Sequence, residues 1–356
     1  LDALRIPEHA YVNPETDAAH CCGHHAQMAG IFGAALALTV PEIAEKLGGQ
    51  VVFFATPAEE YGEIEFKNQL REQGKIRYGG GKCELIRTGA FDDIDLCLAH
   101  HIQPGDEIQV GSGTGNGFVS KVIRYLGKAA HAAGAPDKGV NALSAASLGL
   151  QALGLNRETF RDEDCVRVHP IITKGGNLVN VIPDEIVIET LVRAKTIEAF
   201  TDAAKKTDRS FQAGAVAMGA KVEITTLPGY LPTLAEQALP ELKRAAELAA
   251  PEVPVREAAG HSGGSTDVGD VQHLMPVYTF NTGGVKGGLH QINFEVTNEE
   301  EAYIDTAKMF ALAAYGLLKE KAARSKELVK NYKPVFKDSA EYTKFMEQFD
   351  SKEVLD

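Results

Sequence analysis

Four short segments of this chain concentrate residues that bind metal ions. "CCGHH" (21–25) joins two cysteines to two histidines, "PAEE" (57–60) ends in adjacent glutamates, and "AHHIQP" (99–104) carries two histidines. "GGVKGGLHQ" (283–291) places His290 in a glycine-rich loop. One such cluster alone is more often a solvated helix start or a hydrogen-bonded histidine. Four of them, all in predicted loops after buried strands, indicate a metal centre.

The adjacent pair Glu59 and Glu60 is the most informative feature for the type of reaction. Neighbouring residues point in different directions, so one carboxylate can bind metal while the other acts as a base toward water. Metal-assisted hydrolysis needs this division, because a Lewis acid lowers the pKa of water toward about 7 and a base removes its proton. The pair therefore predicts a hydrolytic centre.

The elements that must position these residues form an α/β layer. Apolar residues at helical spacing predict a helix from residue 25 to about 47, with Pro41 in the first turn of a following helix. The runs 51–55 and 96–99 are typical of strands buried on both faces. This order predicts a mostly parallel sheet flanked by helices, and ligands usually bind at the carboxyl ends of such strands.

The pattern changes after Gly111. The predicted elements are a strand at 117–127, a helix at 141–154, strands near 165–174 and 186–195, a helix at 197–219 and a strand at 221–227. This β-α-β-β-α-β order is that of a ferredoxin-like α+β domain. We therefore expect a discontinuous catalytic domain, 1–113 plus 228–356, with an inserted dimerisation or lid domain at 114–227. The catalytic domain ends in a helix at 299–322 and a charged tail.

Composition excludes several classes of function. The net charge of −13 argues against nucleic acid and anionic membranes as partners, and no apolar run has the length of a membrane span. The five cysteines are odd in number and irregularly spaced, which favours a reducing, cytoplasmic location over a disulfide framework. "LDAL" at the start resembles the end of a buried strand, so we expect earlier strands before Leu1.

Seven motifs appear in the order found in one protein family. They are "LDAL…HCCGHH", "FFATPAEEYGE", "LAHHIQP", "GKAAHAAGAP", "GGNLVNVIPD", "GHSGGSTDVGDVQH" and "GGLHQ". The chain resembles the di-metal amidohydrolases of the aminoacylase and glutamate-carboxypeptidase type. Its motifs are most similar to the branch of p-aminobenzoyl-glutamate hydrolases and auxin-conjugate amidohydrolases. The resemblance covers nearly the whole chain up to about residue 325.

The resemblance implies a centre of two divalent metal ions, zinc or manganese. The implied metal ligands are Cys22, His24, Glu60, His101 and His290, with His100 as the competing assignment for His101. Glu59 matches the general base, and Asp2 matches an aspartate that orients a ligand or the base. One departure is His25, which stands where relatives usually carry aspartate.

The predicted inserted domain carries the other implied site residues. His131 resembles a histidine that reaches across a homodimer and stabilises the oxyanion, with a solvated turn histidine as the alternative interpretation. Asn180 resembles a substrate-binding asparagine, but it also fits a turn before Pro183. Arg193 is able to hold a substrate carboxylate, whereas a strand-edge arginine is the plainer interpretation.

The resulting expectation is hydrolysis of an amide bond in an N-acyl or aminoacyl amino acid. The p-aminobenzoyl-glutamate-like conjugates are one such substrate class. A dipeptidase acting on short peptides is the alternative enzyme. A catalytically silent relative that binds metal or ligand is the alternative from another class, and retention of Glu59 argues against it.

Overall fold

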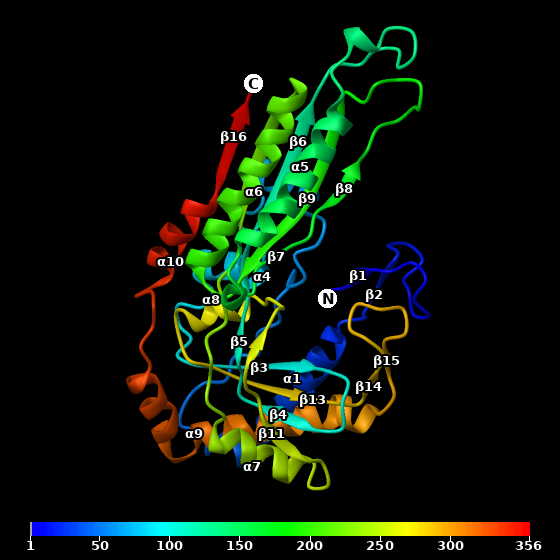
Figure 1. The fold of residues 1–356 in the computed structure, drawn as a ribbon. Helices are drawn as coiled ribbons and strands as arrows, with labels where there is room; N and C mark the ends of the chain where they lie inside the picture. Colours follow the sequence, from blue (N-terminus) through cyan, green and yellow to red (C-terminus); the bar gives the residue numbers. More distant parts are fainter. Residues whose placement is uncertain (1) are drawn as a thin grey trace.

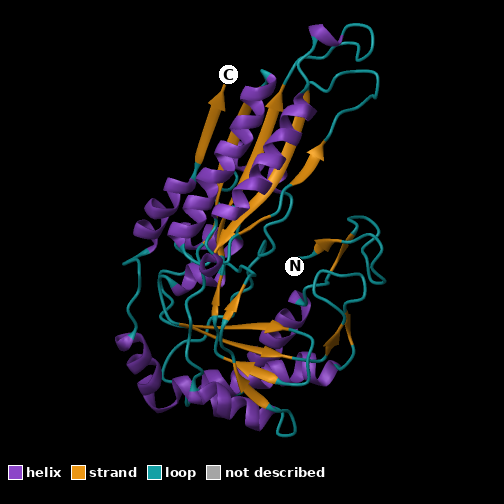
Figure 2. Ribbon diagram, viewed as in Figure 1, coloured by secondary structure: helices purple, strands orange, loops and turns teal. Residues whose placement is uncertain are grey.

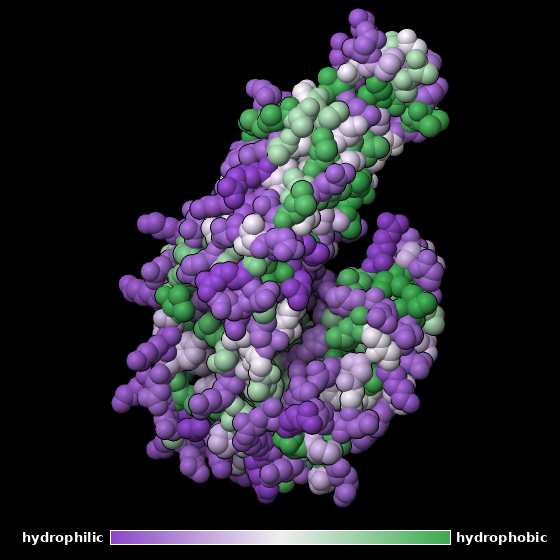
Figure 3. All heavy atoms as spheres, in the orientation of Figure 1, coloured by the Kyte–Doolittle hydropathy of each residue, from purple (hydrophilic) through white to green (hydrophobic). Residues whose placement is uncertain are grey.

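The computed structural model describes residues 2–356, so Leu1 of the predicted strand end lies outside the described residues. The chain forms two lobes, one above the other in the view of Figure 1, and Figure 2 shows that each lobe contains both helices and strands. We call them the lower lobe, with the sheet β11-β4-β13-β3, and the upper lobe, with the sheet β16-β10-β6-β9-β7. Figure 3 shows a hollow between the upper lobe and the part of the lower lobe that carries β1, β2, β14 and β15.

The sheet of the lower lobe is mixed rather than mostly parallel. Its strands are β3 (Cys97–Ile102), β4 (Ile108–Val110), β11 (Val255–Glu257) and β13 (Val277–Thr282). β3 runs parallel to β13, and β4 parallel to β11, but β13 and β4 are antiparallel. Ile108, Val110 and Phe280 of this sheet pack against α7 (Pro240–Ala249) and α9 (Thr306–Asn331), which makes one continuous core.

The predicted strand at residues 51–55 does not form. This segment has no strand hydrogen bonds, and Val52 and Phe53 are 45% and 39% exposed. Among the described residues no neighbouring strand supplies a hydrogen-bonding ladder, and an apolar run alone does not make a strand. The prediction of a strand at 96–99 is confirmed by β3.

Helices of the lower lobe follow the predicted pattern more closely. α1 (His24–Leu38) ends just before α2 (Pro41–Ala44), which has Pro41 in its first turn. α1 packs against α9. α9 is preceded by a π-helical turn (Glu300–Asp305), and non-helical residues at 319–322 divide it. Shorter helices are α3 (Ile64–Glu72), α4 (Gly81–Arg87) and α8 (Val268–Gln272).

The upper lobe is an antiparallel sheet with two helices on one face. Its long strands are β6 (Gly117–Leu126), β9 (Glu185–Ala194) and β10 (Lys221–Tyr230). β7 (Arg167–Val168) and β8 (Ile171–Lys174) both pair with β9, so the predicted strand near 165–174 is two short strands. α5 (Ala142–Asn156) and α6 (Ile197–Met218) pack against each other and against the sheet.

The end of the chain returns to the upper lobe. After α9 come α10 (Ser339–Met346) and β16 (Ser351–Leu355), and β16 pairs antiparallel with β10. Figure 1 shows this red segment running from the lower lobe up along the edge of the upper sheet. The expected boundary assigns 228–356 to one domain, whereas this pairing places residues 351–355 on the sheet of the other.

Small elements complete the two lobes. Two-stranded sheets are formed by β1 (Leu4–Arg5) with β2 (Ala18–Ala19), β5 (Thr114–Gly115) with β12 (His261–Ser262), and β14 (Val285–Lys286) with β15 (Glu295–Val296). Short 3-10 turns span Pro136–Lys138, Arg157–Thr159, Asp162–Asp164 and Glu347–Phe349. In residues 2–356 we find no helix with the length and apolarity of a bilayer span. All five cysteines are free thiols, as expected.

Candidate metal centre

Gly23 forms the turn that aims two predicted ligands at one point. Its φ of 91° lies in the left-handed region, and a Cβ there would stand 2.0 Å from Ile102 Cγ2. Only glycine fits this conformation and this close approach. The turn places Cys22 just before α1 and His24 at its first residue, and both side chains are buried.

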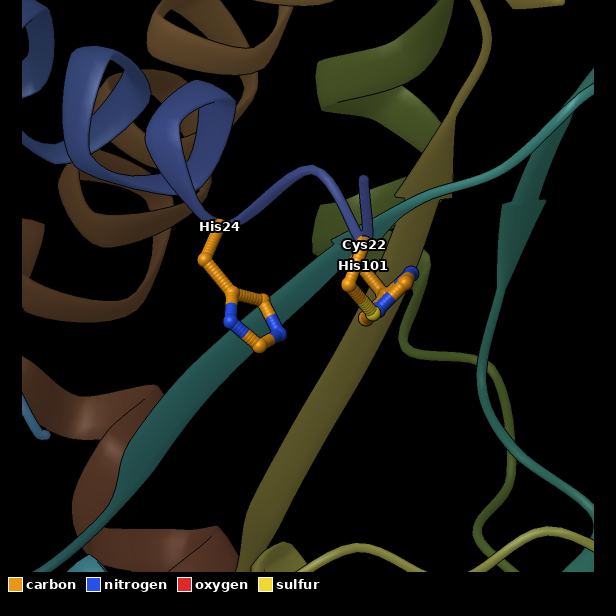
Figure 4. Close-up of side chains that lie close together, drawn as sticks. All are labelled: Cys22, His24 and His101. Atoms are coloured by element: carbon orange, nitrogen blue, oxygen red, sulfur yellow. The ribbon is translucent and has the colours of Figure 1, made fainter. Parts of the chain in front are cut away.

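Cys22, His24 and His101 form the first group of possible ligands. The Cys22 sulfur lies 3.4 Å from His101 Nε2, and donor atoms of all three residues lie within 4.8 Å of one another. Figure 4 shows Cys22 beside His101, with the His24 ring extending from the start of α1. His101 Nδ1 donates to the Ile102 carbonyl at 2.6 Å, which leaves Nε2 free to act as a ligand.

The side chains of His100 and His101 point to opposite faces of β3, so the two histidines have different surroundings. His100 Nε2 hydrogen bonds with Thr282 Oγ1 at 2.8 Å, and its ring packs against Phe280 and Phe310, with the centroids 4.8 and 6.0 Å apart. Side chains of successive strand residues point to opposite faces, so His100 enters the core under α9 while His101 faces the cluster. The structure brings together His101, and not His100, with the other predicted ligands.

Glu60 and His290 complete a second group that also contains Cys22. Glu60 Oε2 lies 3.3 Å from His290 Nε2, and Glu60 Oε1 lies 3.8 Å from His24 Nε2. Oε1 is buried and lacks a hydrogen-bond partner within residues 2–356. His290 has a left-handed φ of 63°, an uncommon conformation for a non-glycine residue and one often found at functional sites.

This arrangement fits metal ions on the chemistry of its donors. An orphaned buried carboxylate oxygen needs a donor or a cation. Burial, followed by the charge of Glu60, raises the pKa of the Cys22 thiol well above its usual range. Thiolate at this position therefore requires compensating positive charge, which a divalent ion supplies.

The two adjacent glutamates occupy different environments. Burial, and then the charge of Asp267, raises the pKa of Glu59 to about 7. For Glu60 burial acts in the same direction, but the hydrogen bond and charge of His290 outweigh it and lower the pKa. Glu59 Oε2 lies 3.9 Å from His24 Nε2, and Glu59 forms a third possible ligand group with His24 and Glu60 but is in neither group that contains Cys22. Opposite pKa shifts of neighbouring carboxyls are typical of separate acid–base roles.

Asp2 and His25 are not in the two ligand groups that share Cys22 but lie next to residues of them. Asp2 Oδ2 accepts a hydrogen bond from the Glu60 amide at 2.9 Å and lies 4.0 Å from His24 Nδ1. His25 packs beside His20 and Tyr303, with ring centroids 5.4 and 6.1 Å away. Burial lowers the pKa of His25 to about 4, so it contributes no charge near pH 7.

The remaining predicted residues divide between the centre and the far end of the upper lobe. Arg193 Nη1 donates to Ser265 Oγ at 3.1 Å, and its pKa is lowered by burial against the opposing charges of Tyr230, Glu59 and Glu60. His131 and Asn180 instead lie together in the loops beyond β6 and β8, where the Ala132 amide donates to the Asn180 carbonyl at 3.0 Å. The structure does not bring these two residues to the candidate ligands of their own chain.

Sequence analysis missed three residues close to Glu59. Asp267, fully buried, pairs with Lys82 Nζ at 2.6 Å and accepts from the Lys82 amide at 2.9 Å. Lys67 Nζ lies 4.8 Å from the centroid of the Tyr61 ring. The available signals were Lys82 after three glycines and Asp267 in the motif "GHSGGSTDVGDVQH", but neither spacing specifies a partner.

Comparison with known proteins places this centre in a family. The model of peptidase family M20/M25/M40 matches residues 1–315. Xaa-Arg dipeptidase from Mus musculus is 28% identical over 325 residues, which are 88% of this chain and 67% of that protein. One of the p-aminobenzoyl-glutamate hydrolase subunits of Escherichia coli is 30% identical over 49% of this chain and 32% of its own length.

A solved structure shows the same fold. It is a dinuclear metal binding peptidase of the M20 family from Bacillus subtilis, 23% identical, with a TM-score of 0.57 over 89% of this chain and 80% of that one. The family match covers most of the chain and confirms the resemblance drawn from the seven motifs. The chain belongs to peptidase family M20/M25/M40 and is a hydrolase.

Proposed function

We propose that this chain hydrolyses an amide bond between an acyl or aminoacyl group and an amino acid, at a centre of two divalent ions. One observation carries the proposal: Cys22 belongs both to the group with His24 and His101 and to the group with Glu60 and His290. A thiolate shared in this way provides negative charge and polarisability to two cations. The mixed sulfur, nitrogen and oxygen donors suit zinc by their softness, and the family resemblance implies manganese as the alternative.

Side chains of this chain would carry out the proton transfer and position the ligands. When bound, the ions would polarise the scissile carbonyl and lower the pKa of the attacking water. Glu59 removes the proton from that water and delivers it to the leaving nitrogen. Asp2 fixes the Glu60 backbone and faces His24 Nδ1, which holds this ring in the orientation that directs Nε2 toward the other donors.

Residues 114–227 are proposed as a ferredoxin-like dimerisation or lid domain that brings His131 to a second active site. The His131 Nδ1 atom accepts from the amides of Gly134 and Ala133 at 3.0 and 3.3 Å, so the neutral ring carries its proton on Nε2. That Nε2–H group is a suitable oxyanion donor. Asn180 lies beside it and would contact the same substrate.

Exposed apolar residues support a homodimer through the upper lobe. Ile171 and Ile172 of β8 are 61% and 43% exposed, and Leu178 and Val179 beyond it are 64% and 100% exposed. Figure 3 shows hydrophobic residues along this edge and at the tip of the lobe. Such a patch marks an interaction surface, and a second copy of this chain would place the partner subunit's His131 at the centre.

Two cations near Glu59 support a substrate with a free carboxylate. Neither Arg193 nor Lys67 has an ion-pair partner among the described residues: Arg193 donates to Ser265 while its buried Nε has no hydrogen bond there, and Lys67 lies over the Tyr61 ring. Burial lowers the pKa of Lys67 against the attraction of Asp2, Asp267 and Glu59. A substrate carboxylate would satisfy both groups.

A dipeptidase is the second candidate, because the relative that aligns along 88% of this chain is an Xaa-Arg dipeptidase. A dipeptide and an N-acyl amino acid share the terminal carboxylate and differ in the rest. We therefore keep both substrate classes, in a protein that we propose to be cytoplasmic.

The test is a panel of p-aminobenzoyl-glutamate, other N-acyl amino acids and dipeptides ending in arginine. Each is incubated with metal-free, zinc-loaded and manganese-loaded protein. Metal-dependent turnover that is lost in Glu59→Gln at unchanged metal content supports the proposal. Protein that binds two ions and hydrolyses no amide would instead be a silent relative.

A further inference from the structure

The C-terminal segment 332–355 lies beyond the residues that match the family, and it wraps around α8. The Tyr332 hydroxyl donates to the Gln272 carbonyl, and the amides of Val335 and Phe336 donate to the His273 carbonyl at 2.9 and 3.0 Å. The Phe336 ring stacks on His273, with centroids 5.9 Å apart. Three positions of the segment therefore hold the C-terminal side of one short helix.

Tyr342 makes the most buried of these contacts. Its hydroxyl donates to Asp270 Oδ1 at 2.8 Å, and both residues are fully buried. The other Asp270 oxygen accepts from the Leu231 amide at 3.2 Å. A buried carboxyl group that loses one of its donors is strongly penalised, so this hydroxyl fixes the position of α8.

The loop that leads into α8 contacts three groups of the centre with three consecutive residues. Ser265 accepts a hydrogen bond from Arg193, Thr266 is among the groups that lower the pKa of Glu59, and Asp267 binds Lys82. Any shift of α8 along its axis would therefore move the partners of the proposed base and of the proposed carboxylate-binding arginine together.

The same segment also ties the two lobes. Asp350 pairs with Arg71 of α3 at 2.6 Å, and the Phe349 ring lies 5.3 Å from that of Phe200 in the upper lobe. β16 then extends the upper sheet beside β10. The segment thus contacts α8, α3 and the upper lobe within about twenty residues.

We propose that residues 332–355 are a positioning element of the metal centre, in which Tyr342 holds α8 through Asp270 and thereby keeps loop 265–267 against Arg193, Glu59 and Lys82. This inference rests on the proposed role of Glu59. Tyr342 is a positioning residue: it touches no substrate and acts through Asp270 and the loop.

The experiment compares Tyr342→Phe with Tyr125→Phe. Tyr125 is an equally buried tyrosine whose hydroxyl donates to the Phe211 carbonyl at 2.7 Å, inside the upper lobe and away from α8. Each variant loses one buried hydroxyl, so both should melt at a lower temperature. Only Tyr342→Phe should lower kcat, by about five- to ten-fold, with metal content unchanged.

A double-mutant cycle tests the route through the loop. In an Asp267→Asn background, Tyr342→Phe should lower kcat by a smaller factor than in the wild type, because one of the contacts through which it acts is already broken. Equal kcat losses in both backgrounds, or a Tyr125→Phe loss as large as that of Tyr342→Phe, would overturn the proposal.

Hydrogen exchange gives a readout that needs no substrate. Tyr342→Phe should speed amide exchange in peptides covering 263–272 and 79–85, the latter containing the Lys82 amide that Asp267 holds. Tyr125→Phe should not. Faster exchange in a protein with no hydrolytic activity would contradict the proposed function and leave the positioning contact standing, whereas unchanged exchange in these peptides would overturn the contact itself.

Discussion

The two lobes present their functional residues in different ways. In the lower lobe, five candidate ligands from four distant segments form two groups that share Cys22, with the donor atoms of each group within 4.8 Å of one another, and Glu60 Oε1 is buried without a hydrogen-bond partner in the described residues. In the upper lobe, His131 and Asn180 contact each other's loops and no candidate ligand. The packing of the lower lobe therefore preorganises the candidate ligands. His131 and Asn180 of the upper lobe are instead available to contact a second molecule.

This difference separates binding from catalysis. Metal binding should need only the lower lobe of one subunit, since all proposed ligands lie there. Turnover should need a second upper lobe as well, because the proposed oxyanion donor comes from it. The following predictions test the two requirements, from the largest expected effect to the smallest.

Glu59→Gln should abolish measurable turnover, with a loss of at least about 10³-fold, because the amide keeps the size of the side chain but removes the base. Metal content should stay near that of the wild type, since Glu59 is outside both groups that share Cys22. Steady-state kinetics and elemental analysis measure the two quantities. A variant that keeps near-wild-type rates would show that another group takes the proton.

His131→Ala should lower kcat by about 10²-fold, the usual loss for one oxyanion donor, without changing metal content. Mixing inactive Glu59→Gln and His131→Ala subunits should then restore part of the activity. One site of each heterodimer combines an intact Glu59 with an intact histidine from the other subunit. If demonstrated subunit exchange restores no activity, His131 acts within its own chain or not at all, and the comparison between the lobes fails.

Lys67→Met should raise KM about five- to ten-fold for conjugates of glutamate or aspartate, because an unpaired ammonium group near Glu59 is removed. The effect on dipeptides ending in arginine should be similar, because they carry the same terminal carboxylate. The prediction is checked by measuring KM for both substrate classes with the wild type and the variant. Lys205→Met on the surface of α6 serves as a control for loss of a positive charge. Unchanged KM values for both substrate classes would show that Lys67 does not bind the substrate carboxylate.

Glu236 should make the lower lobe less stable as pH rises. Burial raises its pKa to about 8, although the amide of Thr279 hydrogen bonds to it and opposes this shift. The folded state therefore keeps a proton that the unfolded state releases at about pH 4.5, so stability falls between about pH 4.5 and pH 8. Thermal unfolding of Glu236→Gln against wild type should show a smaller decline over this range. An equal fall of thermal stability with pH in the two proteins would contradict this role of Glu236.

Sequence patterns predicted the parts of the structure that local physics controls. The helix predicted from residue 25, the strand that contains His101 and the alternation of elements in the upper lobe all follow from periodicity. Convergence of Cys22, His24, Glu60, His101 and His290 was implied by family motifs, and the structure brings these five residues together.

Other features depended on partners that no local pattern reveals. Residues 51–55 have the composition of a buried strand, but a strand also needs neighbours, and the described residues supply none. The return of β16 to the upper sheet and the contacts of Asp267, Lys67 and Lys82 join residues far apart in the chain. The choice between His100 and His101 required the register of β3 against β13.

Locating the bound ions tests the central claim most directly. Anomalous diffraction from crystals of the zinc- or manganese-loaded protein should show two peaks about 3.5–4 Å apart. The Cys22 sulfur should lie between them, with His24 and His101 on one ion and Glu60 and His290 on the other. A single peak, or two peaks of which only one contacts Cys22, would contradict the shared-cysteine centre on which the proposed function rests.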